Sequence, residues 1–512
     1  MQRGNASHSK MPAAGKTHVL VRPQQQVLRA VLNGERMSSK IESAKRVLVL
    51  HMDVALLLIQ AAIYAYGWFR YYYPLLQTPR ISMEGFTIGE GMQLYFRGHL
   101  LVLLLYFVLQ TFFFRTYGGR NSGYQKPLRV FSSHIFSLFL VNTLTYFQLS
   151  LMRNWLVPVR IMLLIYAVQL AVSILWIYLT DVLYRMVFPA RQMLLIGGER
   201  PAGEILTKFE SRRDRYHITK SIRLQEGDAR ILQALEEKPG GVILWDIPVE
   251  DRNRLLKECY SRNIRVYIMP RITDVILKGA DQMHLFDTPI FMIQEYALRV
   301  EQRFMKRLID IVLSLLLLII ASPLMLLSAI IIKAYDRGPV LYTQTRCTQH
   351  MREFRMIKFR SMRTDAEADG VARLAAQEDP RITPYGRFIR RCRIDELPQL
   401  YNILRGDMSF IGPRPERPEI IAQYMKSMPE FAYRTRVKAG LAGYAQVYGK
   451  YNTTPYDKLK LDLTYIENYS VWLDLRLMLL TLRILFTPES TEGVGEQQIT
   501  ALRGERDAGD DG

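Results

Sequence analysis

The N-terminal part of the chain alternates long apolar runs with short basic segments. Four apolar runs cover residues 47–69, 92–114, 128–149 and 160–182. Each is long enough to cross about 30 Å of hydrocarbon as a helix. Four such runs in series are typical of a membrane protein, and a buried helical bundle in a soluble protein is the less favoured alternative. Residues 47–185 are therefore predicted to form four transmembrane helices.

Lysine and arginine residues between these runs predict their orientation. They gather before the first run, in the loop after the second run and after the fourth run. They are Arg29, Arg36, Lys40, Lys45, Arg46, Arg115, Arg120, Lys126, Arg129, Arg185 and Arg191. The positive-inside rule places both ends of the four-helix unit in the cytoplasm. Residues 1–46 are polar and basic without the pattern of a cleaved signal, so we expect a disordered cytoplasmic tail.

From residue 190 to residue 297 the pattern changes to short apolar runs that alternate with amphipathic stretches. Runs at residues 192–196, 241–245 and 265–269 are typical of buried strands. This alternation predicts a Rossmann-like parallel sheet. The first turn, Gly197–Pro201, departs from the GxGxxG pattern of dinucleotide-binding turns. A structural or regulatory domain is therefore favoured over a cofactor-binding domain.

A fifth apolar run at residues 308–332 is interrupted by Ser322-Pro323. Proline removes a backbone donor, so the helix is expected to break there, with Ser322 as a partner for a freed carbonyl. Basic residues flank the run on both sides, and a straight span would export one flank against the orientation rule. Residues 306–333 are therefore predicted to form a re-entrant helix that returns to the same side, with a kinked span as the alternative.

Composition limits the classes of partner and compartment. The formal net charge is +20 and 49% of the residues are hydrophobic. Because the basic residues lie beside apolar blocks, they indicate a cytoplasmic membrane face rather than nucleic-acid binding. The three cysteines, Cys259, Cys347 and Cys392, have no paired spacing, which favours a reducing compartment.

Two adjacent carboxylates, Asp395 and Glu396, lie in one of the most basic stretches of the chain. Gly412-Pro413-Arg414-Pro415, a stiff turn that carries an arginine, follows them. Acids beside phosphate-seeking cations are typical of metal-assisted phosphoryl chemistry. For an isolated pair, the simpler alternative is two first-turn acids favoured by a helix dipole.

The segment from Arg303 to Phe486 resembles the bacterial sugar transferases, which are monotopic phosphoglycosyl transferases. The layout of the whole chain resembles the large form of that family. Several motifs occur in the family's order. They are Lys306-Arg307-Leu308-Ile309-Asp310, Ser322-Pro323, Lys358-Phe359-Arg360-Ser361-Met362, Asp379-Pro380-Arg381-Ile382-Thr383, Asp395-Glu396-Leu397-Pro398-Gln399, Gly412-Pro413-Arg414-Pro415, Gly440–Val447 and Leu461–Tyr465.

The resemblance implies a two-step displacement by a mainly helical catalytic domain over residues 303–488. Asp395 would attack the β-phosphate of a UDP-sugar, release UMP and hold the sugar phosphate. Undecaprenyl phosphate would then accept it. The family requires Mg²⁺, and Glu396 matches its metal-associated glutamate, so Asp395 and Glu396 are the expected metal partners.

The resemblance also implies roles for the surrounding motifs. Arg390 and Arg414 match phosphate- or nucleotide-binding positions, Lys358 and Arg360 are further cationic candidates, and Pro413 and Pro415 shape the turn. Lys306, Arg307 and Asp310 match a motif that favours membrane anchoring, although Lys306 and Asp310 at i, i+4 could simply pair with each other. Arg387, Arg391 and Arg393 are expected to contact lipid headgroups or solvent.

Two segments depart from the family pattern. Thr348 and Met351 stand where a glycine-rich turn is usual, and Cys392-Arg393-Ile394 replaces the commoner residues before the acids. The first departure leaves the shape of that loop open, and the second leaves its effect on substrate choice open.

The expected protein is a multi-pass enzyme of the bacterial inner membrane with its catalytic domain on the cytoplasmic face. It would start exopolysaccharide, capsule or O-antigen synthesis, with glucose favoured over galactose as the sugar. Residues 489–512 are expected to form a polar tail, and a homodimer is left open. A processive glycosyltransferase and an inactive membrane scaffold or regulator are the alternatives.

Overall fold

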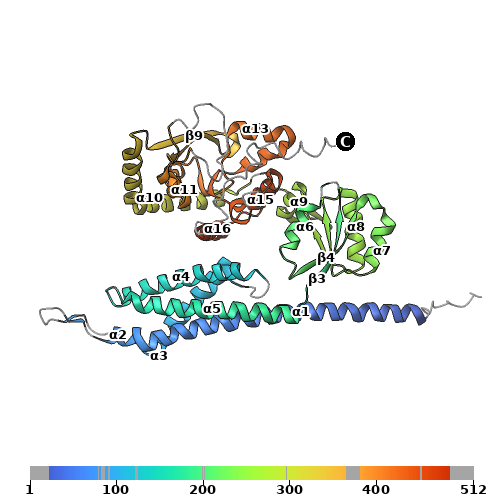
Figure 1. Ribbon diagram of the computed structural model, residues 1–512, viewed down its shortest axis with the longest axis horizontal. Helices are drawn as coiled ribbons and strands as arrows, with labels where there is room; N and C mark the ends of the chain where they lie inside the picture. Colours follow the sequence, from blue (N-terminus) through green and yellow to red (C-terminus); the bar gives the residue numbers. More distant parts are fainter. Residues whose placement is uncertain are drawn as a thin grey trace, which may run out of the picture. The chain divides into compact units, whose positions relative to one another are not determined.

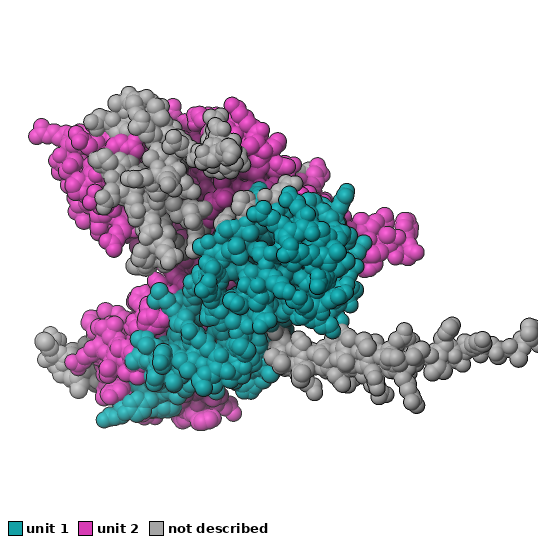
Figure 2. Space-filling view, turned by 45° about the vertical axis from the view of Figure 1, so that its right-hand side comes forward, with its two compact units in different colours: residues 1–70, 120–130, 171–268 teal, residues 71–119, 131–170, 269–512 magenta. Residues whose placement is uncertain are grey.

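The computed structural model describes residues 22–78, 80–81, 87–89, 93–120, 125–198, 200, 202–295, 297–364, 381–449 and 453–484. The chain divides into two compact units, coloured separately in Figure 2. Unit 1 consists of residues 1–70, 120–130 and 171–268, and unit 2 of residues 71–119, 131–170 and 269–512. The predicted polar tail at residues 489–512 and the motif residues Asp379 and Pro380 lie outside the described residues.

Five helical segments in the described part of the chain are long and apolar enough to cross a membrane. The helices concerned are α1 (Arg22–Gly67), α3 (Phe96–Tyr117), α4 (Pro127–Met152), α5 (Val159–Val187) and α10 (Val300–Asp336). A π-helix, Trp68–Tyr72, and α2 (Tyr73–Gln77) continue α1, and β1 (Arg80–Ile81) pairs with β2 (Thr87–Gly89) before α3. The prediction of a membrane protein is confirmed.

Helix α1 begins at Arg22, within the segment that the sequence analysis assigned to a disordered tail. Pro23 lies in the first turn, where its missing N–H has no helical partner in any case. The helix then continues without interruption into the first apolar run. Residues 1–21 of the predicted tail lie outside the described residues.

Buried polar side chains within the apolar helices bond to one another. In unit 2, Tyr106 donates to Asn142 at 3.2 Å, Asn142 donates to Gln169 at 2.8 Å, and Gln169 donates back to the Tyr106 hydroxyl at 2.7 Å. This closed triangle joins α3, α4 and α5. Such bonds satisfy groups that have no water partner in a bilayer, so they favour one packing arrangement of these helices.

Unit 1 contains a four-stranded parallel sheet in the order β4-β3-β5-β6. Its strands are β3 (Arg191–Gly197), β4 (Tyr216–Arg223), β5 (Gly241–Trp245) and β6 (Val266–Ile268). Helices α6 (Gly203–Glu210), α7 (Asp228–Glu236) and α8 (Val249–Ser261) flank the sheet in Figure 1, and a short helix, Leu224–Glu226, precedes α7. The predicted parallel-sheet domain is confirmed.

The turn after β3 packs directly against the loop after β5. A Cβ on Gly198 would lie 2.0 Å from the Asp246 carbonyl oxygen, and the backbone N–H of Arg200 donates to the Asp246 carboxylate at 3.3 Å. A carboxylate at this turn disfavours a bound pyrophosphate. That this domain is structural or regulatory stays a prediction.

Residues 269–297 belong to unit 2, although the sequence analysis assigned them to the Rossmann-like domain. They form α9 (Ile272–Gly279), β7 (Asp281–Leu285) and β8 (Thr288–Met292). Val275 of α9 lies in the same apolar core as Leu463 of the later helix α15 (Pro455–Glu467). The strand-and-helix pattern continues across this boundary, so periodicity alone could not separate the two units.

The remaining elements of unit 2 form the core of the predicted catalytic domain. An antiparallel pair, β9 (Leu341–Cys347) with β10 (Glu353–Phe359), packs with a parallel pair, β11 (Ser409–Ile411) with β12 (Gly440–Ala442). The other elements are η3 (Gln349–Met351), α11 (Pro384–Arg391), η4 (Ile394–Glu396), α12 (Gln399–Arg405), α13 (Pro418–Ser427), η5 (Pro429–Arg436), α14 (Tyr444–Tyr448) and α16 (Val471–Ile484). Apolar side chains from most of these elements share one core, and those of α11 and η4 pack in a second cluster with the end of α10.

The loop that departs from the family pattern adopts left-handed backbone. His350 and Met351 have φ values of 55° and 60°. Glycine adopts this conformation without steric cost, which explains why a glycine-rich turn is usual here. Thr348 holds the loop, because its hydroxyl donates to the Asp407 carbonyl at 2.8 Å and accepts from the N–H of Ala439 at 3.1 Å.

Helix α10 is assigned as helix through Pro323, so the predicted interruption of secondary structure at Ser322-Pro323 is wrong. In Figure 1 the α10 ribbon changes direction along its length. Pro323 cannot donate to the carbonyl of Ile319, four residues earlier. The Ser322 hydroxyl donates to that oxygen at 2.8 Å instead, so helical backbone continues past the proline.

Candidate active site

A sharp turn between α11 and η4 presents the two predicted acids. Arg393, between α11 and η4, has a left-handed φ of 58°, so the helical path of α11 does not continue into η4. Ile394 then packs against Ile332, Phe359 and Ile389, which fixes the start of η4. Asp395 and Glu396 follow in that short helix, 8% and 9% exposed. Both carboxylates are therefore held by backbone geometry and apolar packing.

Three cations surround the Glu396 carboxylate. Arg414 donates to Oε1 at 2.9 Å, Arg393 lies 3.3 Å from the same oxygen, and the Lys358 ammonium lies 3.9 Å away. Burial opposes ionisation, but the charges of Arg414, Lys358 and Arg393 outweigh it and hold the pKa of Glu396 well below its usual range. Glu396 is therefore an anion at neutral pH.

Asp395 lies in different surroundings. Its Oδ1 atom is buried and has no hydrogen-bond partner among the described residues. Burial, followed by the neighbouring Glu396 charge, raises the pKa of Asp395 to about 6, against the opposing charges of Lys358 and Arg390. An ionised carboxylate without partners has its lone pairs available for attack on an electrophile.

The structure brings most of the predicted phosphate-binding residues to this pair. Lys358 projects from β10 and Arg414 from the Gly412–Pro415 turn, and both contact Glu396. Arg390 is half-buried on α11, where its charge lowers the pKa of Asp395. These side chains form a cationic surface around two acids, which suits a diphosphate ligand.

Arg360 was predicted as a candidate phosphate-binding cation, and in the structure its guanidinium contacts residues at and just after the end of α10. Its guanidinium pairs with Asp336 at the C-terminal end of α10 and donates to the Pro339 carbonyl at 2.7 Å. A buried arginine with these partners holds the end of α10 against β10. The motif spacing could not reveal this pairing because Asp336 lies outside every motif.

Pro413 and Pro415 are buried on either side of Arg414 and set the path of the turn. The turn also approaches a neighbouring strand closely, because a Cβ on Gly412 would lie 2.3 Å from the Lys438 carbonyl oxygen. This close backbone contact explains the glycine before the first proline.

The motif predicted to anchor α10 in the membrane, Lys306–Asp310, joins α10 to the rest of unit 2. Lys306 is buried, donates to the Ile411 carbonyl at 2.8 Å and pairs with Asp474 at 2.7 Å. Arg307 donates to carbonyls at the end of α12, those of Ile403 and Leu404, both at 2.7 Å.

Asp310 completes this joint. It accepts hydrogen bonds from the Ser409 hydroxyl and the Phe410 N–H, both at 3.0 Å. The ion pair of Lys306 is with Asp474, and not with Asp310, the i, i+4 partner considered as the alternative. The joint therefore ends at β11, directly before the turn that carries Arg414.

Several site residues were not predicted. Arg393 contacts Glu396 instead of solvent or lipid, whereas Arg387 and Arg391 are exposed as expected. Arg434 and Asp462 form a buried ion pair at 2.9 Å behind the Arg414 turn. The sequence signal for that pair was the presence of an acid in the Leu461–Tyr465 motif, but its partner is distant along the chain.

The acids are oxygen donors that would suit a magnesium ion, whose other ligands would have to come from substrate and water. The described residues contain no group of three or more side chains with the spacing to hold a metal alone. The unpartnered Oδ1 of Asp395 beside a second carboxylate provides oxygen ligands of the kind that Mg²⁺ prefers. Magnesium usually binds through one or two carboxylates together with substrate phosphates, which matches this donor set.

Comparisons with known proteins agree with this geometry. Residues 301–488 match the model of the family described as bacterial sugar transferase. The chain is 35% identical to the UDP-N-acetylgalactosamine-undecaprenyl-phosphate N-acetylgalactosaminephosphotransferase of Aeromonas hydrophila, over 53% of this chain and 68% of that protein. It is 34% identical to the undecaprenyl-phosphate glucose phosphotransferase of Komagataeibacter xylinus, over 57% of this chain and 59% of that protein.

A third relative is the UDP-glucose:undecaprenyl-phosphate glucose-1-phosphate transferase of Escherichia coli K12, which is 37% identical over 40% of this chain and 43% of that protein. The similarity to these last two relatives thus spans about half of their length. The buried acid pair, its cations and these matches lead to one assignment. The chain belongs to the bacterial sugar transferase family and is a sugar-phosphate transferase.

Proposed function

We propose that this chain transfers a hexose 1-phosphate from a UDP-sugar to undecaprenyl phosphate through a covalent intermediate on Asp395. The observation that carries the proposal is the contrast between adjacent carboxylates. Glu396 is neutralised by Arg414, Arg393 and Lys358, whereas Asp395 Oδ1 has no partner among the described residues. Family membership supplies the substrate class, because the relatives act on undecaprenyl phosphate and sugar nucleotides.

In the first step an Asp395 oxygen forms a bond to the β-phosphorus of the UDP-sugar. The bond from that phosphorus to the oxygen bridging the two phosphates breaks, and UMP leaves with the electron pair. The product is an acyl phosphate on Asp395, which is reactive enough to pass the group on. Arg414 and Lys358 are placed to offset the charge on the phosphate oxygens.

In the second step a phosphate oxygen of undecaprenyl phosphate attacks the same phosphorus. The bond to Asp395 breaks, the carboxylate is regenerated, and the lipid diphosphosugar is released. Asp395 and Glu396 would hold a magnesium ion, which supplies charge neutralisation between the phosphates. The same acids and cations serve both steps, so the two substrates exchange at one site.

The membrane arrangement is part of the proposal. Lys306 ties the first part of α10 to β11, and near its end Tyr385 of α11 donates to Ser328 at 2.9 Å. Both ends of α10 therefore contact the same catalytic core. This favours a re-entrant helix, because a helix that spans the membrane would place its two ends on opposite sides. The core would then lie on the cytoplasmic face of the inner membrane, where UDP-sugars are available.

The relatives suggest which sugars this chain could transfer and which class of polysaccharide it could start. Named relatives use glucose, galactose or N-acetylgalactosamine. Glucose is the favoured cargo, with galactose next, and the reaction would begin exopolysaccharide, capsule or O-antigen synthesis.

Release of UMP tests the proposal. Membranes containing the chain should release UMP from one member of a panel of UDP-sugars. The release should require Mg²⁺, and continued turnover should also require undecaprenyl phosphate. Asp395→Asn should abolish release, whereas Glu419→Gln, at an exposed acid on α13, should keep it. Unchanged turnover in Asp395→Asn would exclude this nucleophile, and no release from any sugar would favour an inactive scaffold or regulator.

A further inference from the structure

The turn that carries Arg414 is held through its carbonyl groups. The N–H of Gly440 donates to the Pro413 carbonyl at 2.9 Å, and the N–H of Cys347 donates to the Glu416 carbonyl at 3.0 Å. Arg434 donates to the Arg414 carbonyl at 2.9 Å. The turn's two prolines have no N–H to donate. Apart from the bond from the Gly412 N–H to the Ala442 carbonyl at 2.9 Å, the backbone contacts of the turn among the described residues are made through its carbonyls.

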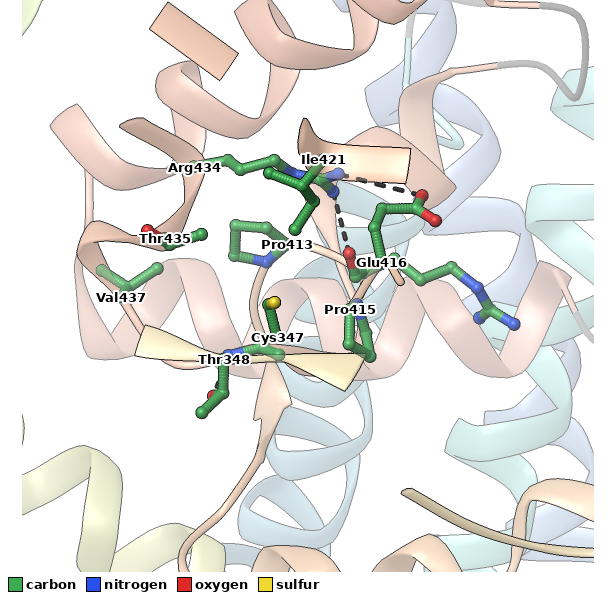
Figure 3. Close-up of a pocket in the computed structure, with 11 residues that line it drawn as sticks. Cys347, Thr348, Pro413, Pro415, Glu416, Ile421, Arg434, Thr435 and Val437 are labelled. Atoms are coloured by element: carbon green, nitrogen blue, oxygen red, sulfur yellow. Dashed lines mark hydrogen bonds and ion pairs between the residues drawn. The ribbon is translucent and has the colours of Figure 1, made fainter. Parts of the chain in front are cut away.

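Two charged side chains from distant parts of the chain donate to this turn. Arg346 of β9 donates to the Pro415 carbonyl at 3.1 Å, and Arg434 comes from η5. Figure 3 shows Arg434 reaching across the pocket behind the turn, between Pro413 and Glu416. Four consecutive carbonyls, those of residues 413–416, therefore each have a fixed partner.

The Arg434 charge is fully enclosed. Its side chain is 3% exposed, and it pairs with the buried Asp462 at 2.9 Å and lies 3.8 Å from Glu416. Burying two charges costs free energy that their attraction repays only with good geometry and additional hydrogen bonds. The additional bond that Arg434 makes here is to the backbone of Arg414.

We infer that Arg434, oriented by Asp462, is a positioning residue that sets where the Arg414 guanidinium meets Glu396. Arg434 touches the Arg414 backbone, while the Arg414 side chain contacts Glu396 on the other side of the turn at 2.9 Å. Arg434 thus acts on the acid pair through Arg414. This inference rests on the proposed function only where it concerns turnover.

The variant that tests it must not leave a buried charge unpaired, because that alone could unfold the protein. Arg434→Gln combined with Asp462→Asn removes both charges and keeps a polar side chain at each position. The matched control is Arg436→Gln. Arg436, two residues along η5, pairs with Glu467 at 3.6 Å and bonds to the carbonyls of Gln294 and Glu295 instead of the turn. Melting temperatures identify any variant that fails to fold.

The first measurement is hydrogen exchange of the full chain in detergent micelles, followed by mass spectrometry. The amides of Gly412, Gly440 and Cys347, whose hydrogen bonds hold the turn, should exchange at least about tenfold faster in the paired variant than in the wild type. They should be unchanged in Arg436→Gln. This readout needs no activity, so it decides the positioning role even if no UDP-sugar is turned over. Equal exchange in the paired variant and the wild type would overturn the inference.

The second measurement is a double-mutant cycle on UMP release with Arg414→Ala. With Arg414 present, the paired variant should lose at least about tenfold in turnover per folded enzyme, because small misplacements of a phosphate-binding group are costly. In the Arg414→Ala background, the paired variant should lose less than about a further twofold in turnover. The reason is that Arg434 acts through the Arg414 side chain, which is then absent. The same loss in both backgrounds would mean that Arg434 is only a stabilising residue.

Discussion

At the residue scale, adjacent acids have opposite electrostatic surroundings. Glu396 faces three cations, and Asp395 is buried with one oxygen that has no partner among the described residues. This difference supports the proposal that Asp395 is the nucleophile and Glu396 a metal partner. Sequence spacing alone indicated two interchangeable acids.

Lys358→Arg should extend activity to higher pH. Burial lowers the pKa of Lys358 to about 8, although the Glu396 charge opposes the shift. The wild-type ammonium is therefore charged below pH 8 and neutral above it, and UMP release should fall above that pH. Arginine stays charged across this range, so its alkaline limb should disappear.

The matched control for that variant is Lys426→Arg, at an exposed lysine on α13. The check is a pH–rate profile for both variants and the wild type. If Lys358→Arg kept the wild-type alkaline limb, another group would be responsible for it.

Glu416→Gln should destabilise the protein near neutral pH and less so in acid. Burial raises the pKa of Glu416, but Lys458, Arg434 and Arg346 lower it more, from its ordinary 4.5 to about 2. Because the folded pKa is depressed, the stabilisation is present above pH 4.5 and is lost as pH falls towards 2. The loss in Glu416→Gln should be on the order of 2 kcal/mol at pH 7.

Melting temperatures in detergent from pH 7 to pH 3.5 measure this effect, with Glu419→Gln as an exposed control. The gap between wild type and Glu416→Gln should narrow below pH 4.5. A gap that stays constant with pH would contradict the ionised network.

The limits of sequence analysis are clearest at particular residues. Asp395, Glu396 and Arg414 could be predicted because the motifs that carry them are short and ordered along the chain. The partners of Arg360 and Lys306, Asp336 and Asp474, could not, because tertiary packing alone brings them together. In the sequence, a buried arginine or lysine that forms an ion pair cannot be distinguished from one that binds phosphate or faces lipid.

At the element scale, α10 shows how a proline is accommodated in an apolar helix. Ser322→Ala should cost about 1 kcal/mol, because it leaves the Ile319 carbonyl without a donor. In a Pro323→Ala background the new N–H can reach that carbonyl, so Ser322→Ala should then be nearly neutral. Unfolding in lipid nanodiscs measures both effects, and equal costs in the two backgrounds would mean that the serine does not replace the proline's missing donor.

The elements themselves were predictable where apolar runs are continuous. The strands β3 and β5 were located closely for this reason. Strand β4 was not predicted, because it lies at the sheet edge and five of its eight residues are exposed. The left-handed residues His350 and Met351 were also beyond sequence analysis, since no glycine marks them.

At the scale of the whole molecule, the five apolar helical segments found among the described residues, together with the family match, indicate a membrane-bound transferase. A cysteine at Glu353, an exposed position on β10, should react with a membrane-impermeant maleimide only from the cytoplasmic side. Cys392→Ser removes the exposed native thiol. A cysteine at the exposed Gln93, in the first loop, is the control and should label from outside. Labelling of position 353 only from outside would exclude the re-entrant arrangement.

The covalent intermediate tests the central claim most directly. The purified chain is incubated with Mg²⁺ and the UDP-sugar that gives UMP release, without undecaprenyl phosphate, and is then digested for mass spectrometry. The peptide containing Asp395 should gain one sugar phosphate, lose it when undecaprenyl phosphate is added, and stay unmodified in Asp395→Asn. Turnover without such an adduct, or an adduct on another residue, would contradict the account.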